Sequence, residues 1–417
     1  MRVVGLIVEY NPFHNGHAYH LNKSKEITNA DFVIAIMSGN FLQRGTPALI
    51  DQWTRTVMAL ENGVDLVIQL PVYYSTSSAE YFANASIEIL NNLGIVDSVC
   101  FGSECGNIEL LTEISRILVN EPSELKCLIK DYLGKGLSFP KARSKALLDF
   151  FKNQNRYTNI DELEKVLDSP NNILGIEYIK ALLKSKSSIK PHTITRQVTG
   201  YHDISIEKPI ASATGIRDFL SNNEEIKPLQ KNVPNNTFDI MSRFYNKSFP
   251  VFIDDFSEYL FYKLLSCTPT QLQSYLDVSE GLEDRIFKYS KECNKISTLI
   301  EKVKTKRFTY TRIQRALIHI LLNIKKDDFQ VLLNTDLIYY IKYLGFKKES
   351  QELLKNIKSN CTLPIISNTN KALGNLTSPA LKMLEKDLYA THLYNLCVSQ
   401  KFNTQLNSDL TQKFIIT

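Results

Sequence analysis

Four short apolar runs alternate with helix-like segments in the first hundred residues, and this alternation constrains the fold more than any other feature. The runs cover residues 3–8, 32–37, 65–70 and 96–101. They are mostly apolar and rich in β-branched residues, which is typical of strands buried on both faces of a parallel sheet. Helical spacing fills the gaps at residues 16–28, 54–61 and 78–93. We therefore predict an α/β fold with a Rossmann-like parallel sheet, whose ligand site lies beyond the carboxyl ends of the strands.

The rest of the chain is expected to be mostly helical. We predict a helical insertion over about 108–186, a short strand at 192–195 and a helix starting near residue 212. After residue 226 helical spacing recurs at 259–265, 282–303, 312–324, 336–344, 350–357 and 380–389. The predicted organisation is a nucleotide-binding domain over 1–225, followed by a helical domain over 226–417.

The charge of the chain is unevenly distributed. Residues 1–225 carry 22 Lys and Arg against 26 Asp and Glu, whereas residues 226–417 carry 27 against 18. The basic half favours a polyanionic partner such as nucleic acid, with a merely solubilising surface as the alternative. The seven cysteines form no C-x-x-C pair, which favours reduced thiols over a disulfide framework or a zinc site. No apolar run reaches the ~20 residues of a membrane span, so we expect a cytoplasmic protein without a membrane partner.

The sharpest motif is H-x-G-H at residues 14–17, directly after the first predicted strand and at the start of the first helix. Gly16 permits close approach of a ligand to the backbone, and a helix N-terminus is a natural seat for phosphate. His14 and His17 could donate hydrogen bonds to an oxygen that gains charge in a transition state. The alternative is one loop histidine and one helix-capping histidine.

A second motif, S-A-T-G-I-R at residues 212–217, opens a helix about 200 residues later. The hydroxyls of Ser212 and Thr214 and the guanidinium of Arg217 are suited to gripping a triphosphate. The alternative is an ordinary N-cap with a surface arginine. The two motifs together, in this order, resemble the nucleotidyltransferase superfamily, in which such histidines hold the phosphates of ATP.

Longer segments narrow the resemblance. GLIVEYNPFHNGH, MSGNFLQRGTPA, PVYYSTSSAEYFA, FGSE, PNNILGIEYIKAL, SATGIR and KRFTYTRIQRALIHILL together resemble the bacterial tRNA(Met) cytidine acetate ligase family over the whole chain. The resemblance implies a reaction in two steps. ATP first activates acetate to acetyladenylate, with release of pyrophosphate. The acetyl group then passes to N4 of the wobble cytidine of elongator tRNA(Met), which becomes N4-acetylcytidine.

The resemblance also implies an ATP site. Its residues would be Ile7, Val8, Glu9, Tyr10, Asn11, Pro12, Phe13, His14, Asn15, Gly16, His17, Ala18, Tyr19, His20, Gly102, Asn172 or its neighbour Asn171, and Arg196. His17 would stabilise the α-phosphate, and His14 and Arg217 the departing pyrophosphate. Mg²⁺ is expected to arrive with the nucleotide, because the sequence suggests no metal site of the protein itself. Glu9 and Asp51 could assist, although solvated carboxylates are the alternative.

Two further sets of candidates concern acetate and RNA. Ser38, Gly39 and Gln43 follow the second strand and could bind acetate, or form a plain loop. The candidate tRNA contacts are Lys304, Lys306, Arg307, Tyr310, Arg312 and Arg315. Their charges could neutralise phosphates and the aromatic ring could stack on a base, the alternative being a solvated helix end. His319, among apolar neighbours, is expected to be a core histidine.

Two other functions remain open at this stage. One is a small-molecule nucleotidyltransferase that adenylylates a phosphorylated metabolite, which would leave the basic half without a use. The other is a non-catalytic RNA-binding protein with a vestigial nucleotide fold, which would leave both phosphate-binding motifs without a use. The sequence indicates no obligate protein partner.

Overall fold

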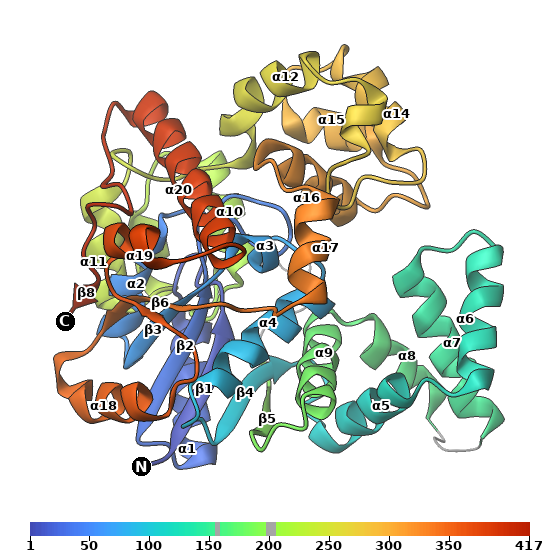
Figure 1. Ribbon diagram of the computed structural model, residues 1–417, viewed down its shortest axis with the longest axis horizontal. Helices are drawn as coiled ribbons and strands as arrows, with labels where there is room; N and C mark the ends of the chain where they lie inside the picture. Colours follow the sequence, from blue (N-terminus) through green and yellow to red (C-terminus); the bar gives the residue numbers. More distant parts are fainter. Residues whose placement is uncertain (155–158, 197–205) are drawn as a thin grey trace.

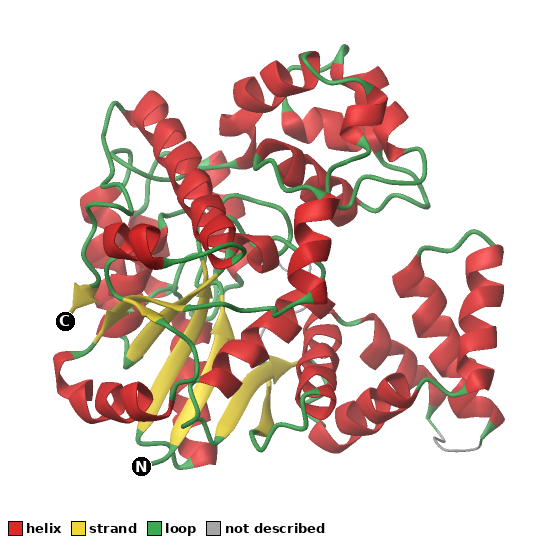
Figure 2. Ribbon diagram, in the orientation of Figure 1, coloured by secondary structure: helices red, strands yellow, loops and turns green. Residues whose placement is uncertain are grey.

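A twisted sheet lies at the centre of the computed structural model, with helices on both faces (Figures 1 and 2). The structure describes residues 1–154, 159–196 and 206–417. The strands follow the order β5-β4-β1-β2-β3-β6-β7, with β8 paired to β6. Their bounds are β1 Val3–Val8, β2 Phe32–Ser38, β3 Leu66–Leu70, β4 Ser98–Ser103, β5 Lys190–Thr195, β6 Ile341–Phe346, β7 Ile365–Ile366 and β8 Ile415–Ile416.

The first part of the sheet is parallel, as predicted. β1 pairs with β2 and β4, β2 with β3, and β4 with β5, all in parallel register. Alternate residues of β2 enter different cores, Ile34 and Ile36 on one face and Val33, Ala35 and Met37 on the other. Burial on both faces explains why β2 is apolar at every position from Phe32 to Met37.

Helices connect and cover these strands. The first group comprises α1 Asn15–Thr28, α2 Gln52–Glu61, α3 Val72–Ser75 and α4 Ala79–Asn92. The segment predicted as a helical insertion is helical, with α5 Ile108–Asn120, α6 Ser123–Gly134, α7 Phe139–Asn153, α8 Ile160–Asp168 and α9 Pro170–Lys184. The predicted helix near residue 212 is α10, Ala213–Asn222.

The C-terminal half is mostly helical. Its helices are α11 Asn235–Phe244, α12 Ser257–Leu265, α13 Pro269–Leu272, α14 Leu282–Ser290, α15 Ile296–Val303, α16 Tyr310–Leu321, α17 Lys326–Asn334, α18 Gln351–Asn360, α19 Thr369–Asn375 and α20 Ala380–Phe402. Three 3₁₀ turns, η1 Lys227–Lys231, η2 Ile253–Phe256 and η3 Lys348–Ser350, occur in the described part of this half. The helix predicted over 282–303 is two helices, α14 and α15.

One predicted helix is wrong. Residues 336–340 form no helix and lead into strand β6 at Ile341. β6 pairs antiparallel with β3 and makes the sheet mixed. Tyr340, Ile341 and Tyr343 are buried, so the run is apolar enough to fit either period, and contact with the edge of β3 decides its structure. β6 covers an edge that would otherwise be open. The sheet therefore includes strands from beyond residue 226, while the division of the chain at residue 225 stays a prediction.

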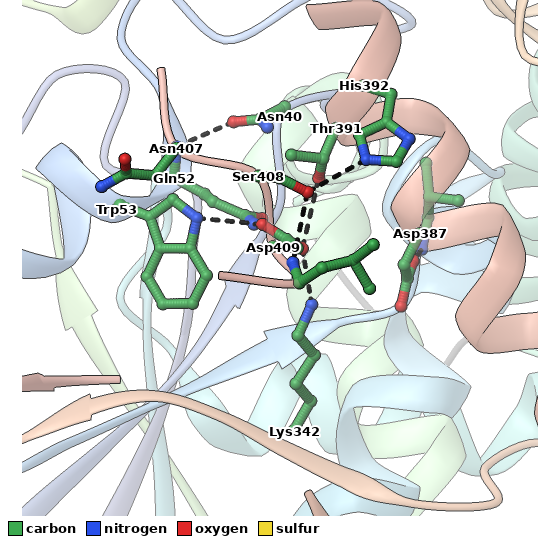
Figure 3. A network of polar contacts seen from close by, with 12 residues as sticks. Asn40, Gln52, Trp53, Lys342, Asp387, Thr391, His392, Asn407, Ser408 and Asp409 are labelled. Atoms are coloured by element: carbon green, nitrogen blue, oxygen red, sulfur yellow. Dashed lines mark hydrogen bonds and ion pairs between the residues drawn. The ribbon is translucent and has the colours of Figure 1, made fainter. Parts of the chain in front are cut away.

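A buried carboxylate ties the C-terminal segment to this sheet. Asp409 accepts hydrogen bonds from Lys342 Nζ at 2.7 Å, Gln52 Nε2 at 3.0 Å and Trp53 Nε1 at 2.9 Å. Figure 3 shows these side chains converging on Asp409 from β6 and α2. Asp409 and Lys342 are both excluded from water. The charge of each is therefore compensated mainly by the other.

Removing one partner of this pair should be costly. Asp409→Ala leaves the Lys342 ammonium buried without a counter-charge, so we expect a loss of about 3–5 kcal/mol in the free energy of unfolding. Urea unfolding measures it. Glu26→Ala, which breaks the exposed pair of Lys23 and Glu26, is the control and should cost no more than about 1 kcal/mol. Equal losses in the two variants would contradict the prediction.

Among the residues that the structure describes, no helix is both long enough and apolar enough to cross a membrane.

Candidate functional site

A cavity of about 230 Å³ opens at the carboxyl ends of β1, β4 and β5. This is the edge at which parallel α/β sheets bind ligands. Many of the predicted ATP-site residues line it, namely Ile7, Val8, Glu9, His14, Gly16, His17, Tyr19, His20, Gly102, Asn171 and Arg196. The cavity thus lies where the sequence places the nucleotide.

The H-x-G-H motif forms the first turn of α1. His14 is the N-cap residue, and its Nδ1 accepts a hydrogen bond from the Gly16 N–H at 3.0 Å. The N–H of His14 in turn donates to Nδ1 of His17 at 3.3 Å, which completes a capping box. The two rings stack with centroids 3.7 Å apart. Because Nδ1 of His14 is an acceptor, its neutral ring carries the proton on Nε2, and the ring lines the cavity as a hydrogen-bond donor.

The histidines of this turn are neutral. Burial, with Arg196 and Arg217 nearby, lowers the pKa of His14 to about 3. Burial and His14 hold the pKa of His17 well below its ordinary value. The pKa of His20 falls to about 4 through burial and the charge of Arg196. The positive charge of the cavity therefore comes from arginines and the N-terminus of α1, whereas the imidazoles supply neutral donors.

This neutrality predicts a dependence of stability on pH. An unfolded histidine binds a proton near pH 6.5, whereas folded His20 does so only near pH 4. Protonation therefore favours the unfolded chain, and the contribution of His20 to the free energy of unfolding is fully present above pH 6.5 and is lost as the pH drops below it. We expect the loss of unfolding free energy between pH 7 and pH 5 to be about 1–2 kcal/mol smaller in His20→Gln than in the native chain.

Urea unfolding at the two pH values measures this difference. His392→Gln, which alters an exposed histidine of α20, is the control and should lose stability as the native chain does. A native-like loss in His20→Gln would contradict the assignment of His20 as a half-buried histidine that stays neutral.

Arg196 and Asn171 form a second wall of the cavity. Nη1 of Arg196 donates to Oδ1 of Asn171 at 3.2 Å, and Nδ2 of Asn171 donates to Oε1 of Glu104 at 2.6 Å. A Cβ atom on Gly102 would lie 3.1 Å from Cγ of Arg196, so this position favours glycine. Burial lowers the pKa of Arg196, although the group stays cationic.

The two asparagines have different surroundings. Asn171 lines the cavity, whereas the side chain of Asn172 is buried and accepts hydrogen bonds from the N–H groups of Glu104 and Cys105. The Nδ2 group of Asn172 donates to the Val166 carbonyl. The resemblance assigns the family's asparagine to Asn172, with Asn171 as the alternative. The structure places Asn171 at the cavity and Asn172 behind it as a brace.

The two motifs that are predicted to bind phosphate meet in space. Nη1 of Arg217 donates to the carbonyl of Asn11 at 2.9 Å, and Nη2 donates to Oγ1 of Thr214 at 3.1 Å. Ser212 caps α10 by accepting from the Gly215 N–H. These three residues are not among those that line the cavity, but Arg217 lies close enough to His14 to lower its pKa. A guanidinium from late in the domain thus supports the H-x-G-H turn.

Other predicted ATP-site residues shape the loop rather than line the cavity. The rings of Tyr10 and Phe13 pack against His17, with centroids 5.0 and 5.7 Å away. Oδ1 of Asn11 accepts from the Leu49 N–H, and Nδ2 of Asn15 donates to the carbonyls of Pro209 and Lys231. Pro12 and Ala18 are not lining residues either.

The acetate candidates separate in the structure. Gln43 lines the cavity, its N–H donates to Oε1 of Glu9 at 2.9 Å, and its Nε2 donates to the Ser77 carbonyl. Ser38 and Gly39 are buried beneath, and are not lining residues. Asp51, considered as a helper or a solvated carboxylate, is instead the buried N-cap of α2, bonded to the Trp53 and Thr54 N–H groups.

Arg55 is a residue that the sequence did not single out. Its guanidinium is fully buried and donates to the carbonyls of Glu9 at 2.6 Å, Ser38 at 3.1 Å and Ile50 at 2.9 Å, and also to that of Gly39. It therefore joins the carboxyl ends of β1 and β2 directly behind the cavity. The sequence gives little indication of this role, because a single arginine on a helix is usually an exposed charge.

Shortening this guanidinium should damage the site. In Arg55→Lys the ammonium cannot satisfy all the carbonyls that Arg55 binds, so we expect a loss of about 3 kcal/mol or more in stability, together with a raised KM for ATP. Urea unfolding and ATP titration at saturating acetate measure the two effects. Arg116→Lys, an exposed arginine of α5, is the control. Native stability and native KM in Arg55→Lys would refute this role.

The candidate RNA contacts are largely ion-paired. Lys304 pairs with Glu301, Arg307 and Arg312 both pair with Glu280, and Arg315 pairs with Asp277 at 2.9 Å. Lys304 also lies over the ring of Tyr310, and Lys306 is exposed. Asp277 also lies 3.6 Å from His319, whose ring nitrogens contact the carbonyls of Leu276 and Thr76. His319 is thus a core histidine, as predicted.

Comparisons with known proteins decide the family. The profile of the HIGH Nucleotidyl Transferase family matches residues 1–409. The tRNA(Met) cytidine acetate ligase of Thermoanaerobacter sp. (strain X514) is 45% identical over 397 residues, which cover 95% of each chain. That of Clostridium perfringens (type A, strain ATCC 13124) is 45% identical over 408 residues, 97% of this chain and 98% of the other. The chain belongs to the tRNA(Met) cytidine acetate ligase family.

Solved structures of this ligase family have the same fold. Thermotoga maritima TmcAL bound with alpha-thio ATP (form II) superposes with a TM-score of 0.91 at 35% identity, covering all of this chain and 99% of the other. Its apo form I gives 0.92 over the full length of both chains. The helical C-terminal half of the chain is therefore part of the fold that these ligases share.

Proposed function

We propose that this protein is an ATP-dependent ligase that forms acetyladenylate and transfers its acetyl group to N4 of the wobble cytidine of elongator tRNA(Met). The observation that carries the proposal is the meeting of the H-x-G-H turn and the Arg217 helix beside one cavity at the carboxyl edge of the sheet. The names of its relatives and the nucleotide analogue bound in its Thermotoga maritima neighbour support it.

In the first step, a carboxylate oxygen of acetate attacks the α-phosphorus of ATP. An O–P bond forms, the bond to the β-phosphate bridge breaks, and pyrophosphate leaves. Positioning and charge stabilisation carry such a step, so no nucleophile of the protein is needed. We assign the α-phosphate to His17, and the pyrophosphate to His14 with Arg217. Neutral imidazoles donate hydrogen bonds here without holding the product through a full charge.

Acetate is assigned to the part of the cavity beside Gln43. Gln43 is the acetate candidate that lines the cavity, and its backbone N–H is bound to the Glu9 carboxylate. Mg²⁺ would supply neutralisation of the phosphate charge. We propose that it comes with the nucleotide, because no cluster of three His, Cys, Asp or Glu side chains suited to a metal occurs in the described residues.

In the second step, the exocyclic N4 amine of cytidine attacks the acetyl carbonyl carbon. An N–C bond forms, the bond between that carbon and the phosphate oxygen breaks, AMP leaves, and N4 releases one proton. The exposed Lys304, Lys306, Arg307 and the neighbouring Tyr310 remain our candidates for RNA contact. Arg312 and Arg315 are half-buried in ion pairs, so they would serve the RNA by holding α16 in place. Because the proposed substrate is a tRNA, we also propose that the protein acts in the cytoplasm.

Acetate-dependent exchange of label between pyrophosphate and ATP tests the first step. We expect exchange with acetate, and a loss of at least about 100-fold in His17→Asn, because an interaction with the reacting phosphate is removed. His392→Asn, an exposed histidine of α20, is the control and should exchange normally. Exchange driven by a phosphorylated metabolite instead of acetate would favour a small-molecule nucleotidyltransferase, and the absence of any exchange would refute the ligase.

A further inference from the structure

The α6–α7 hairpin has a charge opposite to that of its surroundings. Residues 123–153 carry seven Lys and Arg against three Asp and Glu, whereas the other residues of 1–225 carry 15 against 23. The exposed lysines are Lys126, Lys130, Lys135, Lys141, Lys145 and Lys152. Figure 1 shows α6 and α7 at one margin of the molecule, with α9 between them and the sheet. Because residues 1–225 as a whole carry a net negative charge, their composition does not reveal this local excess of positive charge.

Most of these lysines lack a carboxylate partner. Within the described residues, Lys126 makes an ion pair with Glu121, while Lys130, Lys135, Lys141, Lys145 and Lys152 make none within 4 Å. Lys135 and Lys145 lie over the Tyr132 ring, at 4.8 and 6.0 Å from its centroid. In contrast, the basic residues around α16 are mostly paired with Glu280, Asp277 or Glu301. The hairpin therefore offers the less neutralised charge to a polyanion.

The tip of the hairpin also exposes apolar and aromatic surface. Phe139, at the start of α7, is 55% exposed, and Leu133, near the end of α6, is 41% exposed. A Cβ atom on Gly134 or Gly136 would meet nothing within 4 Å, so the connection stands in open space. An exposed ring among unpaired lysines is the combination that binds single-stranded nucleic acid, by stacking on bases and neutralising phosphates.

The hairpin is fixed to the helix that lines the ATP cavity. Nη1 of Arg143 on α7 pairs with Oε1 of the buried Glu177 on α9 at 2.6 Å, and Lys180 pairs with the other oxygen at 2.7 Å. Asn171, Leu174 and Tyr178 of the same α9 line the cavity. Phe139 precedes Arg143 by about one helical turn, ~6 Å along α7. The ion pair thus joins α7 to the helix that lines the cavity, so the hairpin has a defined orientation relative to the cavity.

We propose that the α6–α7 hairpin is a docking arm for the RNA substrate, with Lys135, Lys141 and Lys145 on its phosphates and Phe139 stacked on an unpaired base. This inference rests on the proposed function, since it takes the substrate to be tRNA. It assigns a role to the insertion for which the sequence suggested none. Arg143 acts as a positioning residue, because it reaches the substrate only through the orientation of the hairpin.

The test compares two triple variants in the full-length protein, with an in vitro transcript of elongator tRNA(Met) as the probe. The first is Lys135→Gln with Lys141→Gln and Lys145→Gln. The control, Lys348→Gln with Lys355→Gln and Lys358→Gln, removes the same charge from η3 and α18, at the opposite margin in Figure 1. Fluorescence anisotropy at several salt concentrations and KM for the transcript are measured. Acetate-dependent exchange of pyrophosphate without RNA shows that each variant is folded.

We expect the hairpin variant to bind the transcript about 10-fold or more weakly, with the slope of log K against log salt reduced by about 2–3, and with native exchange. The control should retain the native slope. Phe139→Ala should weaken binding without changing the slope, because stacking releases no counterions, while Tyr262→Ala, at an exposed tyrosine of α12, should leave binding unchanged.

The possible failures are distinguishable. If the native chain acetylates the transcript and the hairpin variant matches the control in affinity and slope, the docking arm is refuted while the ligase stands. If both triple variants weaken binding equally, the effect is one of net charge alone and the docking arm is again refuted. If the native chain neither binds nor modifies the transcript, the RNA half of the proposed function is refuted, together with the docking arm.

Discussion

The buried guanidinium of Arg55 is the interaction on which the site most depends. Where parallel strands end, their last carbonyls lose their partners in the sheet and must be satisfied if they stay buried. Arg55 donates to the carbonyls of Glu9 and Ser38, at the ends of β1 and β2, and to those of Gly39 and Ile50. The two strand ends are thereby held together by a group with enough donors in a fixed plane. Glu9 can then face the cavity and bind the loop that carries Gln43.

The structure of the H-x-G-H turn follows from the same requirement that backbone polar groups be hydrogen-bonded. A helix N-terminus has unpaired N–H groups, and here the imidazoles of His14 and His17 act as the capping side chains. Capping uses Nδ1 of His14 and leaves its Nε2 proton for a ligand. The two interpretations that the sequence left open, a cap and a phosphate ligand, are therefore compatible, because one ring can cap the helix through Nδ1 and donate through Nε2. Burial keeps the rings neutral, so the cavity gains donors without further charge repulsion beside Arg196 and Arg217.

The sequence predicted correctly those parts of the fold whose hydrophobic pattern is compatible with a single type of secondary structure. Continuous apolar runs such as β2 are stable only with both faces covered, and these strands and their connecting helices were placed within a few residues. The prediction for β6 was wrong, because the apolar residues around Tyr340 and Ile341 fit a helical and a strand pattern equally well. Pairing with the edge of β3 decides that this segment forms a strand. The two predicted phosphate-binding motifs could be recognised as patterns because each is local in the sequence. The role of Arg55 and the choice between Asn171 and Asn172 could not be predicted. The direction and burial of these side chains depend on backbone groups that are distant in the sequence.

Helix α9 joins the candidate ATP cavity to the hairpin that we propose as an RNA docking arm. One side of it presents Asn171, Leu174 and Tyr178 to the nucleotide cavity, and Glu177 on the same helix holds Arg143 of the α6–α7 hairpin. A buried ion pair of this kind contributes little to net stability compared with an apolar pair, but it specifies one geometry, because any other would leave Glu177 charged and unpaired. Lys180 binds the second oxygen of Glu177, and these cations hold its pKa below the ordinary value despite burial. A rigid connection between α9 and the hairpin suits a two-step reaction. The acetyladenylate is formed in the cavity, and the wobble cytidine of a much larger tRNA must be positioned to reach it there.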